Sequence, residues 1–340
     1  MNKTAVVTGV TGQDGAYLTQ LLLDKGYVVY GTHRRRSNFW RIKELGIAEH
    51  PNLHLVEHAI PDFDANLRMI EETEPTEVYN LAALNIVAEA TSNPIATGKV
   101  TGMAALNLLE AIRVVDPKIR FFQASSSEMF GHVREFPQDE RTPLRPHSPY
   151  AAAKAYAHWM TSYYRESCEM FCAAGILYSH ESPLRGLEFV TRKITNGLVN
   201  VSSGDQDSVE LGNLDAKRDW GYAKEYVAGM HQMLETESPD TYVLATGRLK
   251  TVREFVELTC NALNIELAWR GEGLDEVGID CSDGKNIVKI NPDFYRPREA
   301  YVRVGNSAKA KKELGWEATM TLAELCELMV AAELSRSGKV

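Results

Sequence analysis

The chain has 340 residues and a formal net charge of -9 at pH 7. This length can bury a sizeable core and exceeds what one core usually needs, so we expect two lobes. The acidic balance argues against nucleic acid or an anionic membrane as the main partner, and local basic clusters are then expected to serve small anionic ligands.

The beginning of the chain predicts a strand, a glycine turn, a helix and a second strand. Residues 4–8 are β-rich, residues 17–25 are amphipathic and residues 27–31 are again apolar. The chain enters this pattern without an apolar leader and has no apolar run of about 18 residues, so we expect a cytoplasmic protein.

The glycine turn lies directly after the first strand, where a dinucleotide fingerprint requires it. Its glycines let backbone N–H groups approach a pyrophosphate at the helix N-terminus. The turn therefore predicts a cofactor site formed by Gly9, Thr11, Gly12, Gln13, Asp14 and Gly15.

The loop after the second strand is basic and contains no acid within residues 32–37. An acidic residue there suits the ribose 2′-hydroxyl of NAD, whereas guanidiniums suit a 2′-phosphate. We therefore expect Arg34, Arg35 and Arg36 to favour NADP, with NAD less suitable. A solvated basic loop or an oligomer contact remains the alternative.

Apolar runs at residues 53–56, 77–81 and 120–123 alternate with helical patterns at residues 66–72 and 103–115. This alternation predicts an α/β fold with a Rossmann-like, doubly wound parallel sheet.

The second half of the chain predicts a smaller α/β substrate lobe. We expect residues 1–175 to bind the cofactor and residues 176–340 to form mostly the second lobe, with a segment near 210–250 returning to the first. Residues 242–245 are the candidate returning strand. The stretch 271–286 is rich in Gly, Asp and Glu and is expected to be an exposed loop.

Five cysteines occur without a Cys-x-x-Cys pair or a nearby histidine cluster. They are typical of reduced thiols in a cytosolic protein, and no metal site is expected.

Tyr150 and Lys154 lie four residues apart in an alanine-rich stretch that favours a helix, so both face one side of it. The Lys154 ammonium can then lower the pKa of the phenol, which lets Tyr150 exchange a proton with a substrate hydroxyl. A chance surface pair is the alternative reading.

Ser126 and Glu128 extend this chemistry. Together with Tyr150 and Lys154 they suggest a sugar that is oxidised transiently, with Ser126 bonding the reacting oxygen. The ketone acidifies the neighbouring C–H, and Glu128 could remove that proton and protonate a departing hydroxyl. Alternatively, residues 125–127 merely end a strand and Glu128 is solvated.

The tract 175–195, with residues 9–15, 123–128, 148–154 and 217–221, closely resembles GDP-mannose 4,6-dehydratases, an extended short-chain dehydrogenase/reductase group. The resemblance spans nearly the whole chain. It implies an NADP-dependent hydro-lyase that forms GDP-4-keto-6-deoxymannose. The alternatives are a GDP-sugar epimerase, a 4-keto reductase or a catalytically silent nucleotide-binding paralogue.

The resemblance also implies roles for individual positions, beginning with catalysis by Ser126, Glu128, Tyr150 and Lys154. Cofactor contacts are implied at Ala59, Ile60, Leu81, Ala82, Ala83, Tyr150, Lys154, His180 and Arg185, and substrate contacts at Asn85, Ser126, Ser179, Val190, Lys193, Arg218, Arg296 and Glu299. The family commonly forms tetramers in which the arginine loop reaches a neighbouring cofactor, so a homotetramer or dimer is expected.

Several positions depart from the family pattern near the expected ligands. Where the family usually has an Asp in the turn after the third strand, this chain reads Glu57-His58-Ala59-Ile60. It also has Asn85, Ala96, Thr101 and Ser179 where the family usually has Ser, Tyr, Asp and Asn. These departures leave the identity of the sugar, and turnover itself, open at the level of sequence. Asp62 is a candidate to replace the missing adenine contact.

Overall fold

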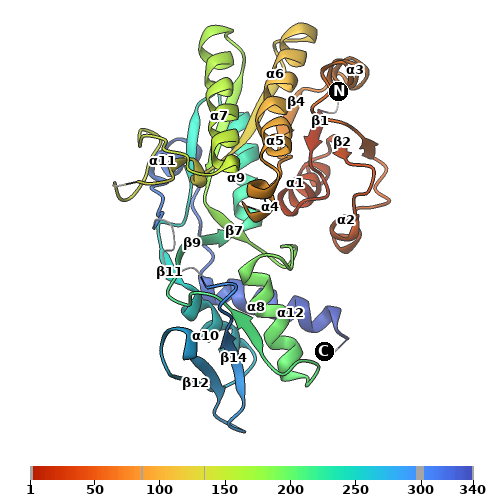
Figure 1. The fold of residues 1–340 in the computed structure, drawn as a ribbon. Coiled ribbons are helices and arrows are strands. Elements are labelled where there is room, and N and C mark those ends of the chain that lie inside the picture. The colour runs from red at the N-terminus through yellow and green to blue at the C-terminus, as the bar shows by residue number, and fades with distance from the viewer. Residues whose placement is uncertain (1–2, 86, 134, 296–301, 339–340) are drawn as a thin grey trace. The chain divides into compact units, whose positions relative to one another are not determined.

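The computed structural model describes residues 3–85, 87–133, 135–295 and 302–338. The chain divides into two compact units (Figure 1). The first unit comprises Met1–Tyr178, Ala223–Ala245 and Gly305–Glu317, and the second comprises Ser179–Tyr222, Thr246–Val304 and Ala318–Val340. Neither unit is continuous in sequence.

A seven-stranded parallel sheet forms the centre of the first unit, in the order β10-β6-β5-β4-β1-β2-β3. The prediction of a Rossmann-like, doubly wound α/β fold is therefore confirmed. The run at residues 242–245 was expected to return to this sheet, and β10 pairs with β6. The strands are β1 (Thr4–Thr8), β2 (Val28–His33), β3 (Leu53–Glu57), β4 (Glu77–Asn80), β5 (Arg120–Ser126), β6 (Cys172–Leu177) and β10 (Thr241–Leu244).

Helices pack on both faces of this sheet. On one face α3, α6 and α7 contact one another in series, and on the other α1 packs against α9 (Figure 1). The helices of the unit are α1 (Gln13–Asp24), α2 (Trp40–Glu44), α3 (Phe63–Thr73), α4 (Val87–Ser92), α5 (Pro94–Thr97), the π-helix η1 (Gly98–Met103), α6 (Ala104–Val115), the 3₁₀ helix η2 (Ser127–Phe130), α7 (Pro149–Ser167), α9 (Ala223–Glu235) and α11 (Ala308–Leu314).

The sheet's central strands are almost entirely buried because helices cover both faces. The side chains of Val6, Val78 and Phe121 are completely buried, and they meet Leu108 and Ile112 of α6 in one core cluster. This packing fixes the carboxyl ends of β1, β4 and β5, where the candidate site residues lie.

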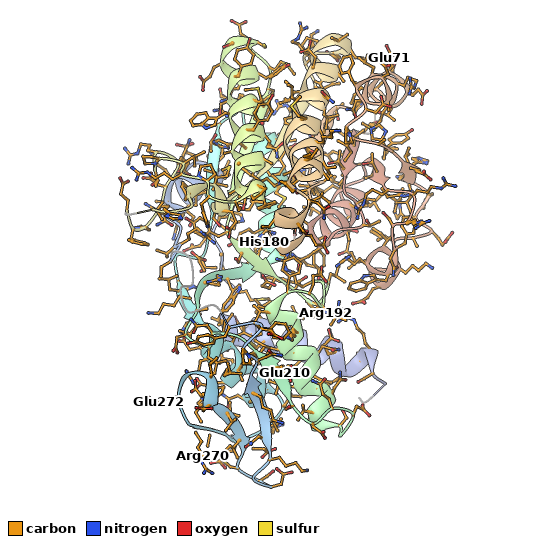
Figure 2. The ribbon with its side chains drawn as sticks, in the orientation of Figure 1. Glu71, His180, Arg192, Glu210, Arg270 and Glu272 are labelled. Carbon is orange, nitrogen blue, oxygen red and sulfur yellow. The ribbon has the colours of Figure 1, made fainter. Side chains whose placement is uncertain are left out.

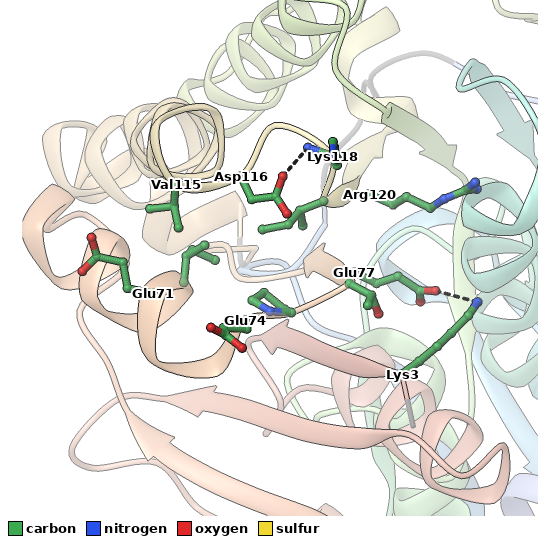
Figure 3. A pocket seen from close by; sticks show the side chains of 12 residues that line it. Lys3, Glu71, Glu74, Glu77, Val115, Asp116, Lys118 and Arg120 are labelled. Carbon is green, nitrogen blue, oxygen red and sulfur yellow. Dashed lines mark hydrogen bonds and ion pairs between the residues drawn. The ribbon is translucent and has the colours of Figure 1, made fainter. Parts of the chain in front are cut away.

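The opposite, amino-terminal edge of the sheet holds a cavity of about 690 Å³ (Figure 3). Glu77 is buried there and is already fully engaged. It accepts hydrogen bonds from Lys3 at 3.1 Å, from Tyr27 at 3.1 Å and from Tyr79 at 2.8 Å. Burial raises the pKa of Tyr27 to about 12, with the Glu77 carboxylate contributing. These hydrogen bonds connect the beginnings of β1, β2 and β4, and they lie at the opposite edge of the sheet from the candidate site.

The second unit contains two small sheets, ordered β11-β9-β7 and β12-β13-β14-β8. Its strands are β7 (Ser179–Glu181), β8 (Val209–Leu211), β9 (Lys217–Tyr222), β11 (Leu249–Thr251), β12 (Leu267–Arg270), β13 (Val277–Asp280) and β14 (Asn286–Ile290). Three helices, α8 (Val190–Ser202), α10 (Val252–Ala262) and α12 (Leu322–Arg336), contact one another, and η3 (Gly273–Asp275) is a short 3₁₀ turn.

The expectation of an exposed loop at 271–286 is right about the exposure of residues 271–275 and 281–285, but it is wrong about the strand that lies between them. β13 lies within this stretch and pairs antiparallel with both β12 and β14. Trp269 and Ile279 are only partly exposed, whereas Val288 is completely buried. Cross-strand pairing outweighs the polar composition that suggested a loop.

Within the part of the chain that the structure describes, every helix is too short or too polar to cross a membrane.

Candidate active site

The topological switch point of the sheet lies between β1 and β4, where neighbouring strands continue in opposite directions along the sheet. Ligands of open α/β sheets bind outside the strand ends at such a point. A pocket of about 650 Å³ lies here, within the first unit. Its lining includes Gly9, Thr11, Gly12, Arg34, Arg35, Ala59, Ile60, Leu81, Ala82, Ala83 and Asn85, all of which the sequence predicted as ligand residues.

The pocket lining also contains residues that the sequence analysis did not identify as ligand contacts: Thr32, His33, Ser37, Glu57, His58, Pro61, Leu84 and Val100. Most of them lie at the ends of β2, β3 and β4 or directly after them, so the parallel register brings them together. Conversely, Gln13, Asp14, Gly15 and Arg36 were predicted but do not line this pocket.

The glycine turn brings two backbone segments into close approach. Gly9 has φ +73°, and a Cβ atom there would lie 3.0 Å from Ala82 Cα. A Cβ on Gly15 would lie 2.3 Å from Gly9 O, so α1 can start directly beneath the turn only with glycine there. Gly12, the N-cap residue of α1, lines the pocket, so the N-terminus of this helix faces it and can bind a phosphate group.

A chain of polar side chains crosses the buried ends of three strands. Thr8 Oγ1 donates to Asn80 Oδ1 at 2.8 Å, and Asn80 Nδ2 donates to Gln123 Oε1 at 2.9 Å. Thr8 Oγ1 also accepts from the backbone N–H groups of Leu81 and Ala82. These hydrogen bonds hold in place the backbone of Leu81 and Ala82, which follows β4 and lines the pocket.

The outer edge of the pocket is basic. Arg34 and Arg35 are exposed, and Ser37 Oγ accepts a hydrogen bond from the backbone N–H of Arg34 at 3.1 Å. Thr32, at the pocket floor, has a buried Oγ1 atom for which the described residues provide no hydrogen-bond partner. Such an orphaned hydroxyl fits a ligand that supplies the missing partner.

Ser126 and Glu128 lie where β5 passes into η2. The backbone N–H of Glu128 donates to Ser126 Oγ at 3.2 Å, so the serine caps the short helix on which Glu128 lies. Both side chains are partly exposed. Ser126 therefore has a structural role, because it caps the turn at the end of β5. The same hydrogen bond also holds Glu128 next to Ser126.

Tyr150 and Lys154 lie one turn apart on α7, with Lys154 Nζ 5.9 Å from the Tyr150 ring centre. The helix begins at a cap in which Ser148 Oγ accepts from Ala151 N, and Pro149 occupies its first turn. Lys154 is buried, and its Nζ donates to Ala124 O on β5 at 2.7 Å. Burial lowers the pKa of Lys154 to about 8, against the opposing effect of the Asp14 carboxylate.

A second contact between α7 and β5 lies one turn further along the helix. His158 Nδ1 and Ser125 Oγ are 2.9 Å apart, and both side chains are buried. Burial lowers the pKa of His158 to about 4, so the ring stays neutral near pH 7. Lys154 and His158 therefore hold two consecutive residues of β5, the two directly before Ser126.

The remaining predicted ligand residues belong to the second unit. His180 is buried on β7, and Ser179 precedes it and pairs with Trp220 of β9, the strand that also carries Arg218 (Figure 2). Val190 starts α8, which also contains Lys193.

Two of the predicted ligand residues in the second unit are cations that lie over aromatic rings. Lys193 Nζ lies 3.8 Å from the centre of the Phe294 ring, and burial lowers its pKa against the opposing Glu210 carboxylate. The Arg185 guanidinium lies 3.5 Å from the centre of the Phe189 ring. The predicted residues Arg296 and Glu299 lie outside the described residues.

Comparison with known proteins decides the family. A sequence model of the family described as GDP-mannose 4,6 dehydratase matches residues 6–329. The chain belongs to this family. GDP-mannose 4,6 dehydratase 2 of Caenorhabditis elegans is 45% identical over 98% of this chain and 89% of its own, and GDP-mannose 4,6-dehydratase of Sinorhizobium fredii is 45% identical over 98% and 97%.

Among solved structures, dTDP-glucose 4,6-dehydratase of Bacillus anthracis, in complex with NAD, has the same fold. Its TM-score is 0.81 at 20% sequence identity, over 99% of this chain and 98% of that one. The resemblance to the GDP-mannose 4,6-dehydratase family that the sequence motifs indicated is confirmed.

The departures from this family's pattern have structural places. Thr101 is buried, and its Oγ1 accepts from the backbone N–H of Leu84 at 3.1 Å, which supports the pocket wall. Ala96 is exposed on α5. Asp62 caps α3 by accepting from Ala65 N at 3.0 Å, so its carboxylate has a helix-capping role. Ala59 and Asn85 both line the pocket.

Proposed function

We propose that this member of the GDP-mannose 4,6-dehydratase family is a hydro-lyase that converts GDP-mannose, or a close GDP-sugar, to its 4-keto-6-deoxy product. The observation that carries the proposal is the family match over residues 6–329, reinforced by 45% identity to GDP-mannose 4,6-dehydratases over nearly the full chain. The site agrees, because all four predicted catalytic residues lie in the first unit at the end of β5 and on the neighbouring α7.

The cofactor is a nicotinamide dinucleotide, and we infer NADP rather than NAD. The pocket residues fit it: Gly9 permits close backbone approach, Thr32 retains a buried hydroxyl without a described partner, and Arg34 with Arg35 suits a 2′-phosphate. When bound, the nicotinamide supplies transient oxidation, taking a hydride from C4 of the sugar and giving it back at C6.

Tyr150 acts as the base for the C4 hydroxyl, and Lys154 assists it. Below about pH 8 Lys154 is charged, and its ammonium favours the phenolate form of the nearby ring. Ser126 hydrogen-bonds the oxygen that becomes the ketone. Tyr150 keeps the proton from this hydroxyl and later donates it to C5.

Glu128 performs the elimination. The C4 ketone acidifies the C5 proton, which the Glu128 carboxylate removes. The same proton then goes to the departing C6 hydroxyl, which leaves as water. The hydride lost at C4 is regained at C6 and C5 is reprotonated, so one water is lost and there is no net redox change.

The second unit supplies the substrate half of the proposal. Lys193 and Arg218 are cations suited to a diphosphate, and Ser179, Val190, Arg296 and Glu299 are the further substrate residues that family membership suggests. His180 and Arg185 complete the cofactor contacts. Residues 1–175 then form mainly the NADP-binding part and residues 176–340 mainly the GDP-sugar part.

The chain is also proposed to self-associate as a dimer or homotetramer in the cytoplasm. Tyr156, Trp159 and Tyr163 of α7, with Met103 at the end of the adjoining η1, are exposed apolar side chains, and we call them the α7 face. Contiguous exposed apolar groups support a protein contact, here with a second copy of the chain. The five cysteines are free thiols, which is typical of a reducing compartment.

The test is incubation with GDP-mannose and NADP. We expect a product lighter by one water that carries a 4-keto group, without accumulation of NADPH, and tighter binding of NADP than of NAD in a parallel titration. In Glu128→Gln we expect turnover to fall by about 10²- to 10⁴-fold, because the elimination loses its base.

The matched control is Glu135→Gln, which removes an exposed carboxylate from the following loop and should retain turnover. Unchanged turnover in Glu128→Gln would contradict the elimination step. Steady NADPH oxidation with a keto-sugar would instead identify a reductase, and binding without any product a silent paralogue.

A further inference from the structure

A buried carboxylate on the last helix of the second unit gathers two guanidiniums. Glu333 of α12 is 4% exposed. Its Oε1 accepts from Arg192 Nε at 2.7 Å and from Arg336 Nη1 at 2.6 Å, and its Oε2 accepts from Asn196 Nδ2 at 3.0 Å. With both oxygens engaged, this carboxylate fixes the orientation of both arginines.

Each of the two arginines also donates one hydrogen bond to the main chain of the same loop. Arg192 Nη1 donates to the carbonyl of Arg185 at 2.7 Å, and Arg336 Nη2 donates to the carbonyl of Pro183 at 2.7 Å. The acceptors are two residues apart in the loop that follows β7. Figure 2 labels Arg192 and His180 within the second unit.

The loop also has internal hydrogen bonds of its own. The backbone N–H of Arg185 donates to Ser182 O at 3.0 Å, and that of Leu184 donates to Ser182 Oγ at 3.1 Å. These bonds form a single tight turn, which includes the carbonyls of Pro183 and Arg185 that the arginines bind.

A second carboxylate orients the side chain that the turn presents. Glu181 Oε2 lies 3.1 Å from Arg185 Nε, an ion pair whose geometry is not that of an aligned hydrogen bond. Thr191 Oγ1 donates to the same carboxylate oxygen at 2.5 Å. The main chain of the turn is therefore held from α8 and α12, and the Arg185 side chain is held from β7.

We propose that Glu333 is a positioning residue for the turn at residues 182–185, which we call the ligand turn, and that it acts through Arg192 and Arg336. The inference rests on the proposed function, which assigns Arg185 and the neighbouring His180 to the cofactor. Removing the Glu333 charge leaves two guanidiniums without their shared counter-charge, and in glutamine one acceptor oxygen is replaced by an NH₂ donor. The arginines are then held less firmly, and their hydrogen bonds to the two carbonyls weaken.

Hydrogen exchange of the full-length chain measures this directly. In Glu333→Gln and in Arg336→Met we expect the amides of Leu184 and Arg185 to exchange on the order of tenfold faster than in the wild type. In Glu333→Gln the Kd for NADP should rise on the order of tenfold, because small misplacement of a binding group has large effects. Glu333→Asp should recover part of both losses.

The matched control is Glu276→Gln, which breaks another arginine–carboxylate pair of the second unit. Arg253 donates to both oxygens of Glu276 and to Asp215, and it does not bond the ligand turn. This variant should lower the melting temperature without changing exchange at Leu184 and Arg185 or the Kd for NADP.

The outcomes separate the two proposals. Unchanged exchange at Leu184 and Arg185 in both variants, or an equal increase in Glu276→Gln, would overturn the positioning role. If Glu333→Gln does not fold, Arg336→Met decides, since it keeps the carboxylate and removes one anchor. A wild-type chain that binds no NADP would overturn the proposed function, while the exchange result would still test the anchoring.

Discussion

At the scale of single residues, Lys154 combines two properties that oppose each other. It is buried, which favours the neutral amine, and it donates to a carbonyl of β5 while lying beside the Tyr150 ring. Burial lowers its pKa from 10.5 to about 8. The residue is therefore charged at neutral pH only at a cost to folding, which a bound anionic cofactor would reduce.

This cost predicts a pH dependence of stability. Between pH 8 and 10.5 the unfolded chain holds the proton that the folded chain has lost, so the free energy of unfolding should rise with pH in that window. Relative to Lys154→Met, the wild type should gain up to about 3 kcal/mol across it.

Denaturant unfolding of both proteins at several pH values measures the difference. Parallel curves for the two proteins from pH 7.5 to 10.5 would contradict the lowered pKa of Lys154. The same experiment with bound NADP should show a smaller difference, because the phosphates favour the ammonium.

Sequence reasoning predicted which residues carry the chemistry but not which contacts hold them in place. The spacing of Tyr150 and Lys154 predicted a shared helix face, and α7 provides it. The partners of Lys154 and His158 on β5 are about 30 residues away in sequence, so no local pattern indicated them. Likewise, His58 and Val100 line the cofactor pocket through strand register and helix packing, which residue types alone do not reveal.

At the scale of elements, the turn between β1 and α1 is tightly constrained. Gly9→Ala combines a positive φ with a Cβ placed 3.0 Å from Ala82 Cα. We expect a loss of about 1–2 kcal/mol in the free energy of unfolding. The displaced backbone should also raise the Kd for NADP by at least about tenfold, because the turn faces the phosphate position.

Gly26→Ala provides the matched control. Gly26 has φ +81°, but a Cβ there would meet no atom within 4 Å. It should lose about 1 kcal/mol of stability and keep the affinity for NADP. Thermal unfolding and a cofactor titration of both variants measure the two effects separately. Equal affinities in both variants would show that the close approach of Gly9 to Ala82 is unimportant for binding.

Elements were predictable wherever one signal dominated. β1 spans the residues that the apolar run predicted. The strand β13 within residues 271–286 was not predicted, for a physical reason. Gly and Asp there form the turns of a meander, and the short strand between them, β13, takes its stability from pairing on both sides.

At the scale of the whole molecule, the α7 face predicts the oligomeric state. Trp159 is 58% exposed and Tyr163 is 51% exposed on one side of a long helix. Trp159→Glu would place a charge in the proposed contact, which costs several kcal/mol if the contact is desolvated. We expect it to shift the protein from dimer or tetramer to monomer by analytical ultracentrifugation.

Leu274→Glu is the control, since Leu274 is exposed to a similar degree in the second unit. It should leave the sedimentation behaviour unchanged. A monomeric wild type, or an unaltered assembly in Trp159→Glu, would count against self-association through α7.

The interleaving of the two units limits how the protein can be divided. The chain passes from one unit to the other after Tyr178, Tyr222, Ala245, Val304 and Glu317. A fragment ending at Tyr178 would lack β10 and α9, which would leave β6 as an unpaired sheet edge and uncover one face of α1. Unpaired edges promote aggregation. The cofactor part therefore cannot be expressed by simple truncation, and a nick in any one crossing would leave a molecule still joined through the others.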